Sequence, residues 1–178
     1  NTFESVTTRP LISQELDAKH MDLLACYLND LAEVQQIFLH NKEIGYLQYI
    51  PSNLPPISGA IYWCRGLMER LSMPMDFIRA LDSRILERKE AMDITEMYTS
   101  LKGHLEEFER AKINEWGAKI EASTQAKLKN SLLRRDTGSE GEIILVLNFD
   151  PFLVALLREV KHFLLLNLEV PKVALDIY

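Results

Sequence analysis

The sequence predicts a mainly α-helical fold: an elongated antiparallel helical bundle with one short β element near 143–147. Apolar residues recur at spacings of three and four over most of the chain, which is typical of amphipathic helices. Only seven Gly and seven Pro occur in 178 residues, which leaves little room for an all-β architecture with many turns. The run 143–147 is short, β-branched and apolar, and this composition predicts a buried strand.

The first segment, 1–50, is predicted to be a long helix or helical hairpin that leads into the bundle. Its apolar stripe lies between Leu11 and about Leu47 and contains Leu16, Met21, Leu24, Leu28, Leu31 and Phe38. The proline-containing segment 51–56 ends this helix, because proline lacks a backbone N–H and clashes with the preceding turn.

The second segment, 51–135, is predicted to form the main helical bundle. Pro55 and Pro56 open a helix, since proline suits the first helical turn, and Met73-Pro74 is expected to end it. The stripe of this helix is Ile57, Ile61, Cys64, Leu67 (or Met68) and Leu71, and the small residues 58–60 permit another backbone or a ring to approach. Beyond Pro74 we expect two helices, about 75–91 and 94–134 with Asp93 as N-cap, or one bent helix. Their stripe is Ile78, Leu81, Ile85, Ile94, Met97 (or Tyr98), Leu101, Leu105, Phe108, Trp116, Ile120, Leu128 and Leu132.

The third segment, 136–178, is predicted to contain a loop, the short strand and the closing helices. The strand 143–147 lacks a partner of comparable strength in the sequence, so we expect its partner to lie outside it. Asp150 and Pro151 form a strong helix start, with Asp150 as N-cap and Pro151 as the first helical residue. This helix should reach about Leu168, and a last helix should run from Pro171 to the end.

Composition and charge exclude several classes of protein. Hydrophobic residues make up 47% of the chain and charged residues 26%, which indicates a globular protein. A net charge of -6 disfavours a dedicated nucleic-acid or anionic-membrane binder, and the apolar runs are too short to span a bilayer. Cys26 and Cys64 are predicted to be reduced and packed, which favours an intracellular compartment. Neither end carries a start or stop signal, so we expect a segment of a longer protein.

The sequence contains no convincing catalytic, cofactor-binding or metal-binding constellation, and we assign no such residue and no cofactor. The histidines, His20, His40, His104 and His162, are scattered, and His104 with Glu107 supplies only two of the three or four ligands of a metal site. The acidic stretch 106–110 is interpreted as a solvated helix face. Basic residues near the predicted end of the long helix favour its dipole, with an acidic partner as the alternative: Lys119, Lys127, Lys129, Arg134 and Arg135. Trp63 and Trp116 are interpreted as core anchors.

Four segments, taken in order, carry a resemblance to a known family. They are Asn-Leu-Pro-Pro-Ile-Ser-Gly-Ala-Ile-Tyr-Trp at 53–63, Leu-Met-Glu-Arg-Leu at 67–71, Met-Pro-Met at 73–75, and the segment 148–161, which begins Asn-Phe-Asp-Pro. Their ordered combination resembles the N-terminal tail (stem) region of a dynein heavy chain, over about 50–178. The apolar segment 163–166 and the ending 174–178 look more like axonemal, outer-arm chains than the cytoplasmic form.

The resemblance implies a non-catalytic tail segment of a microtubule motor whose ATPase ring lies elsewhere in the full-length protein. Such tails are scaffolds for heavy-chain association, for binding intermediate and light chains, and for anchoring the motor. The implied partners are other dynein heavy chains, intermediate chains, light chains or docking factors, with no nucleic acid and no membrane. The implied location is the cytoplasm or cytoskeleton, in particular the ciliary axoneme. The alternative is a helical adaptor or tethering domain unrelated to dynein.

Overall fold

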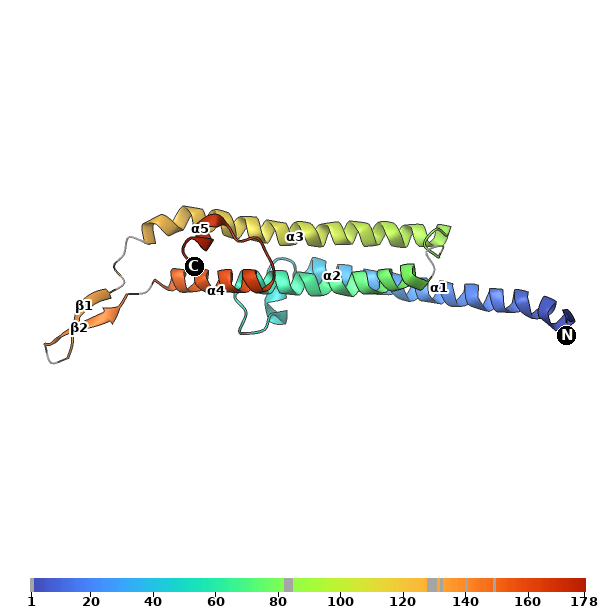
Figure 1. Ribbon diagram of the computed structural model, residues 1–178, viewed down its shortest axis with the longest axis horizontal. Coiled ribbons are helices and arrows are strands. Elements are labelled where there is room, and N and C mark those ends of the chain that lie inside the picture. The colour runs from blue at the N-terminus through green and yellow to red at the C-terminus, as the bar shows by residue number, and fades with distance from the viewer. Residues whose placement is uncertain (1, 82–84, 128–130, 132, 140, 149) are drawn as a thin grey trace. The chain divides into compact units, whose positions relative to one another are not determined.

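A computed structural model describes residues 2–81, 85–127, 131, 133–139, 141–148 and 150–178 (Figure 1). It is mainly α-helical, with one two-stranded antiparallel sheet among these residues, which confirms the predicted fold class. The chain divides into two compact units, described separately below. Unit 1 comprises Asn1–Gly45 and Cys64–Glu107, and unit 2 comprises Tyr46–Trp63 and Phe108–Tyr178.

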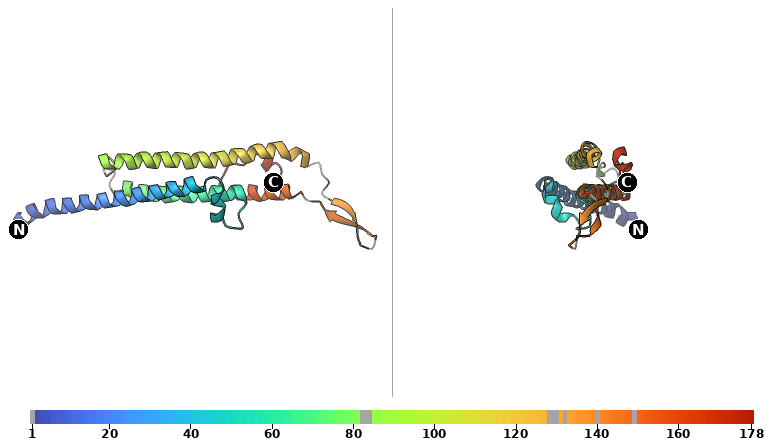
Figure 2. Two further views of the ribbon diagram at one scale, coloured as in Figure 1. Left: turned by 180° about the vertical axis from the view of Figure 1, so that it is seen from behind. Right: turned by 90° about the vertical axis from the view of Figure 1, so that its left-hand side faces the viewer.

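Unit 1 consists of three helical segments that lie side by side, each antiparallel to the next (Figures 1 and 2). They are α1 (Thr2–Asn41), the C-terminal part of α2 (Pro56–Leu81) and the N-terminal part of α3 (Lys89–Lys127). Buried residues repeat every three or four positions along each segment, so that each presents one apolar stripe to the others. In α1 this stripe is Leu24, Tyr27, Leu31, Val34 and Phe38.

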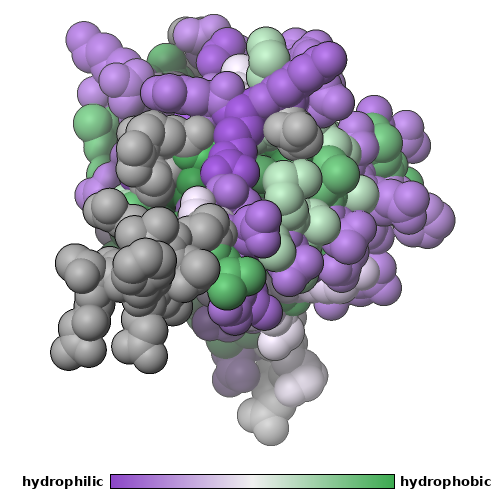
Figure 3. Space-filling view, turned by 90° about the vertical axis from the view of Figure 1, so that its right-hand side faces the viewer, coloured by the Kyte–Doolittle hydropathy of each residue, from purple (hydrophilic) through white to green (hydrophobic). Residues whose placement is uncertain are grey.

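The predicted stripe of α1 is only partly correct. Leu24, Leu31 and Phe38 are buried, whereas Leu16, Met21 and Leu28 are exposed. The N-terminal end of α1 extends past the other two helices of unit 1 (Figure 2). On the end of unit 1 that faces the viewer in Figure 3, hydrophobic side chains lie between hydrophilic ones.

The boundaries predicted at Pro74 and Asp93 are wrong. Helix α2 continues through Pro74 to Leu81, although proline removes one backbone hydrogen bond. Met75 and Ile78, which follow Pro74, are fully buried, and their packing keeps the chain helical past the proline. Helix α3 begins at Lys89, so Asp93 lies inside the helix and does not cap it.

Unit 2 combines the beginning of α2 and the end of α3 with the C-terminal elements. Most of the 3₁₀ helix η1 (Gly45–Tyr49) also belongs to it, as do α4 (Pro151–Leu165) and α5 (Lys172–Leu175). The core of unit 2 joins α2, α3, α4 and α5 through Ile61, Trp116, Ile120, Leu156, Val160, Phe163 and Ala174. The rings of Trp116 and Phe163 lie 4.5 Å apart at its centre.

The residues before the predicted strand form a second strand. Helix α3 ends at Lys127, and β1 (Leu133–Thr137) pairs antiparallel with β2 (Ile143–Leu147), Leu133 opposite Leu147. The predicted helix to about 134 and the predicted outside partner are therefore both wrong. Gly141 adopts a φ of 80° in the turn, where a side chain would be strained, and the Gly138 N–H donates to the Glu142 carbonyl at 2.8 Å. Leu128, Lys129 and Leu132 lie outside the described residues.

Helix α4 begins as predicted and ends earlier than predicted. The Asp150 carboxylate accepts the Phe152 N–H at 2.8 Å, which confirms Asp150 as N-cap and Pro151 as the first helical residue. At the other end, Asn167 has a φ of 53° and the Leu168 N–H donates to the Phe163 carbonyl at 2.9 Å. This pattern is a Schellman motif, which ends α4 at Leu165 instead of Leu168. The last helix, α5, ends at Leu175.

Candidate interaction sites

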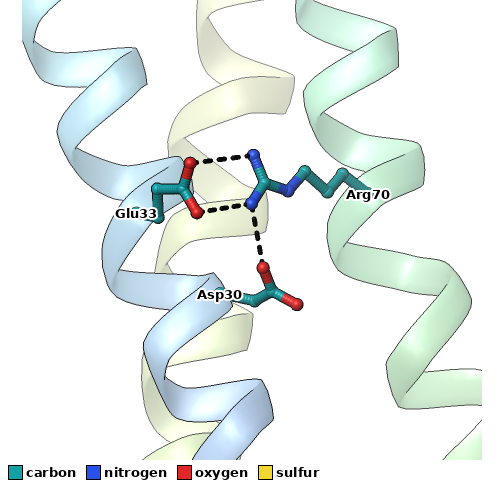
Figure 4. A network of polar contacts seen from close by, with 3 residues as sticks. All are labelled: Asp30, Glu33 and Arg70. Atoms are coloured by element: carbon teal, nitrogen blue, oxygen red, sulfur yellow. Dashed lines mark hydrogen bonds and ion pairs between the residues drawn. The ribbon is translucent and has the colours of Figure 1, made fainter.

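Arg70 of α2 binds two carboxylates of α1 within unit 1 (Figure 4). Asp30 and Glu33 are three residues apart and therefore share one face of α1. The Arg70 Nη2 lies 2.9 Å from Asp30 Oδ1 and 2.7 Å from Glu33 Oε2, and Nη1 lies 3.5 Å from Glu33 Oε1. Hydrogen bonds to Glu33 and Asp30 raise the pKa of the Arg70 guanidinium above its ordinary value. Because the cluster is largely solvated, it contributes at most about 1 kcal/mol and mainly fixes how α1 and α2 align.

Tyr27 makes a second polar contact between the same two helices. It is buried, and its hydroxyl donates to the Leu71 carbonyl at 2.8 Å. Burial raises the pKa of the Tyr27 hydroxyl well above its ordinary value, and the nearby Tyr98 adds to this effect. Tyr27 therefore acts as a neutral hydrogen-bond donor in the core of unit 1.

Glu159 of α4 caps the first turn of α2 within unit 2. Its Oε1 accepts the Ile57 N–H at 2.8 Å, and its Oε2 accepts the Ser58 N–H at 3.0 Å and the Ser58 hydroxyl at 2.6 Å. The first amides of a helix have no partner inside the helix, and its N-terminal dipole favours a negative charge. Glu159 is only 4% exposed. Its buried carboxylate therefore supplies the hydrogen-bond acceptor for the first amides of α2, although it lies about a hundred residues further along the chain.

An apolar cavity of about 240 Å³ adjoins this cap. Its walls come from three helices of unit 2 and include Ile57 of α2, Trp116 and Ile120 of α3, and Phe152 and Leu156 of α4. Apolar walls of this kind can accept an aliphatic or aromatic group.

Three aromatic rings form a cluster elsewhere in unit 2. Tyr46 of η1 stacks on Trp63 of α2 at 5.7 Å, and Phe108 of α3 meets both rings edge-on, at 6.0 and 5.9 Å. The Lys112 ammonium lies 5.6 Å from the Tyr46 ring and 5.5 Å from the Phe108 ring, within cation–π range. Trp63 and Trp116 are both buried, which confirms them as core anchors.

The residues considered for metal binding and thiol chemistry do not form a site among the described residues. Within the described ranges, no group of three or more His, Cys, Asp or Glu side chains could hold a metal ion. His104 and Glu107 are both exposed on α3. Cys64 is buried, with its Sγ 3.2 Å from the Leu105 carbonyl, but Cys26 is exposed, so the prediction that both cysteines are packed is wrong for Cys26.

The basic residues predicted near the end of the long helix do not all belong to α3. Arg134 and Arg135 belong to β1, so the helix dipole cannot explain them. Lys119 is exposed on α3, as are Glu106 and Glu107 of the acidic stretch, which fits a solvated face.

The hairpin of β1 and β2 exposes several large apolar side chains. Leu133, Ile143, Ile144, Leu145 and Leu147 are all exposed, so the prediction that 143–147 is a buried strand is wrong. A hairpin of two strands cannot cover its own faces. The turn residues at 136–142 were the signal that could have revealed the hairpin.

Comparison with known proteins identifies the family. The family model described as "Dynein heavy chain, N-terminal region 1" matches residues 1–178, the whole chain. The chain belongs to the dynein heavy chain family. This result confirms the resemblance to the dynein tail and excludes an unrelated helical adaptor.

Several dynein heavy chains are similar to this segment. It is 37% identical over 168 residues to the dynein beta chain of the flagellar outer arm of Chlamydomonas reinhardtii, covering 94% of the segment. It is 32% identical over 162 residues to the gamma chain of the same flagellar outer arm, covering 90%. It is 28% identical over 179 residues to the ciliary dynein beta chain of Heliocidaris crassispina, covering 96%.

This dynein segment spans only 3–4% of the length of these relatives. The match lies in the N-terminal region of the heavy chain. Within the part of the segment that the structure describes, no helix has both the length and the hydrophobicity needed to cross a membrane.

Proposed function

We propose that this segment is a non-catalytic scaffold of a dynein tail, through which heavy chains associate and intermediate chains, light chains or docking factors bind. The match of the whole chain to the N-terminal region of dynein heavy chains carries this proposal. Its exposed apolar groups, on the hairpin and along the first half of α1, offer surface to neighbouring subunits. The Glu159 cap links α4 to α2 within unit 2, and the Arg70 cluster links α2 to α1 within unit 1, which supports a defined geometry for such contacts.

Binding of dynein subunits tests this role. The purified 178-residue chain is immobilised and exposed to axonemal dynein extracted with high salt, and captured heavy, intermediate and light chains are identified by mass spectrometry. A helical bundle of similar size and net charge serves as the control surface. We expect the chain to retain at least one named dynein subunit that the control does not retain. Folded chain that retains no heavy chain, intermediate chain, light chain or docking factor would contradict the proposal.

We further propose that the heavy chain containing this segment works in the axoneme of a cilium or flagellum. The similarity to flagellar outer-arm and ciliary dynein chains supports this location. A fluorescent tag on the endogenous heavy chain should label axonemes after the membrane is removed. A tag that is released with the soluble cell contents would contradict the axonemal location.

A further inference from the structure

Two adjacent arginines lie on the exposed strand β1. Arg134 and Arg135 are the only adjacent pair of arginines in the sequence, and all five residues of β1 are exposed. A helix dipole does not account for them, since it acts only within the last turn of a helix. Charged side chains on an edge strand limit its pairing with other chains, but this protection requires no particular distance to any other residue.

The two arginines hold a defined position relative to a hydroxyl group. Thr137 follows Arg134 by three residues and Arg135 by two. No other serine or threonine of the sequence has arginine at both of these positions. Ser72 has one arginine two residues before it, but Ser72 lies half-buried inside α2, and that arginine, Arg70, binds two carboxylates of α1.

Arginines at these positions are a recognition signal for one class of protein kinase. Guanidinium groups form bidentate, charge-assisted hydrogen bonds with carboxylates. A serine/threonine kinase with an acidic peptide groove therefore recognises arginines two and three residues before the acceptor hydroxyl. Because the signal is short, it also requires an accessible acceptor in a suitable backbone conformation.

The backbone of β1 has the conformation that such a groove requires. A peptide that lies in a groove of this kind is extended, and β1 is already extended. The Gly138 N–H donates to the Glu142 carbonyl at 2.8 Å, and hydrogen-bonded pairs alternate along an antiparallel ladder. The backbone groups of Arg135 and Thr137 therefore point away from β2. Among the described residues, β2 is the only strand that pairs with β1, so this outer edge faces no other strand.

The hairpin can also adapt to the surface of a kinase. An isolated two-stranded hairpin is marginally stable, and segments with few buried contacts open locally at low cost. Arg134 pairs with Asp136 at 3.0 Å, but this ion pair is exposed, so a carboxylate of the kinase can replace it. Thr137 and both arginines are exposed, so their binding requires no rearrangement of the helices.

We propose that Thr137 is a phosphorylation site for an arginine-directed serine/threonine kinase. The Thr137 Oγ1 forms a bond to the γ-phosphorus of magnesium-bound ATP, and the bond from that phosphorus to the bridging oxygen breaks. ADP is the leaving group, and the hydroxyl proton passes to the catalytic aspartate of the kinase. This inference goes beyond the proposed scaffold role and does not depend on it.

The phosphate changes the charge of one face of the hairpin. It carries about −1.5 to −2 charges at pH 7, which nearly offsets the positive charges of Arg134 and Arg135. Side chains alternate along a strand, so Thr137 shares its face with Arg135 and with its cross-strand neighbour Ile143, which is 74% exposed. Phosphorylation therefore places a negative group beside an exposed aliphatic side chain and weakens any apolar contact that this face makes.

Phosphate transfer in vitro tests the acceptor. The purified 178-residue chain is incubated with magnesium, ATP and the catalytic subunit of cyclic-AMP-dependent protein kinase, an arginine-directed kinase, and tandem mass spectrometry locates the phosphate. We expect the phosphate on Thr137. Thr137→Ala should lower its incorporation at least about tenfold, whereas Ser139→Ala, which removes a neighbouring exposed hydroxyl, should leave it unchanged. Phosphate mainly on another residue, or no incorporation, would overturn the inference.

Substitution of the arginines tests the recognition. Arg134→Ala combined with Arg135→Ala should lower kcat/KM for phosphate transfer at least about a hundredfold, because two charge-assisted contacts with the kinase are lost. The exposed Arg110→Ala of α3 is the control and should leave kcat/KM unchanged. Circular dichroism should show the same helical content for all variants. Equal values of kcat/KM for the double variant and the parent would overturn the role of the arginines.

A synthetic peptide of residues 131–142 separates the effect of the sequence from the effect of accessibility. Because the hairpin is exposed and opens readily, kcat/KM of the folded chain should lie within about tenfold of that of the peptide. A larger deficit would show that the folded chain hides Thr137, which overturns the inference.

Phosphate on the heavy chain from cells tests whether the site is used. Full-length heavy chain isolated in the presence of phosphatase inhibitors should carry phosphate on Thr137, and treatment with a phosphatase should remove it. Mass spectrometry that detects only the unmodified peptide around Thr137 would overturn the inference.

Discussion

The Glu159 carboxylate accepts two backbone amides and one hydroxyl in a buried position, so its removal leaves several donors without an acceptor. We expect Glu159→Ala to lower the free energy of unfolding by about 2–4 kcal/mol. Glu159→Gln keeps one carbonyl acceptor and should cost about half as much. Urea denaturation followed by circular dichroism measures both, with the exposed Glu121→Ala as control. A loss for Glu159→Ala no larger than that of the control would contradict the capping role.

Tyr27 makes the stability of the chain depend on alkaline pH. Burial raises the pKa of its hydroxyl, so the folded state keeps this proton more tightly than the unfolded chain does. The contribution is therefore complete below about pH 10, the ordinary tyrosine pKa, and is lost as the pH rises above it.

We expect Tyr27→Phe to cost about 1 kcal/mol at neutral pH, because it removes the hydrogen bond to the Leu71 carbonyl. The difference in unfolding free energy between this variant and the parent should shrink above about pH 10. The exposed Tyr62→Phe is the control and should behave like the parent throughout. A difference that stays constant from pH 8 to about pH 11 would rule out ionisation of Tyr27 as the cause.

Two glycines of α2 have opposite surroundings, which permits a matched test at the level of the helix. A Cβ on Gly59 would lie 2.5 Å from Ile50 Cγ2, whereas a Cβ on Gly66 would meet nothing within 4 Å. Gly59→Ala should lower stability by about 1–3 kcal/mol through overpacking. Gly66→Ala should raise it by up to about 1 kcal/mol, because alanine favours the helix. Thermal and urea unfolding measure the change in stability for both variants. If both substitutions raised the stability, that result would contradict the close approach of Ile50.

The start of a helix could be predicted from the sequence where residues of that helix determine it. Asp150 and Pro151 supply both the cap and the first turn of α4, and the Pro55-Pro56 pair begins α2, so both helix starts could be predicted. The residues 133–137 carry no strand signal of their own, since Leu-Arg-Arg-Asp-Thr is compatible with a helix. They become a strand only through pairing with β2.

Contacts between distant segments explain the remaining differences. Pro74 resembles a helix end, but the burial of Met75 and Ile78 keeps α2 continuous. The Glu159 cap joins residues about a hundred positions apart, and no periodic pattern encodes it. Periodicity identified part of the apolar face of α1, but it cannot show which of these positions other helices cover, and Leu16 is exposed.

Across the whole molecule, local stability should vary strongly from one element to another. The hairpin has exposed side chains on both strands, whereas the centre of α2 contains the fully buried Ile61, Cys64 and Leu71. Amides of 133–137 and 143–147 should exchange with deuterium at least about a hundredfold faster than those of 60–71. Mass spectrometry of peptic fragments measures both segments in one sample. Equal protection of the two would mean that the hairpin is already covered in the monomer.

The Glu159 cap also imposes an order on the synthesis of the chain. Unit 1 ends at Glu107, so all of its residues have been made before α4 appears. The first turn of α2 must wait for a carboxylate 101 residues after Ser58. At about 5–20 residues per second, that wait is about 5–20 s, during which the Ile57 and Ser58 amides bond to water or to a chaperone. A ribosome paused before residue 159 would therefore hold a nascent chain whose first unit is complete and whose second is still open.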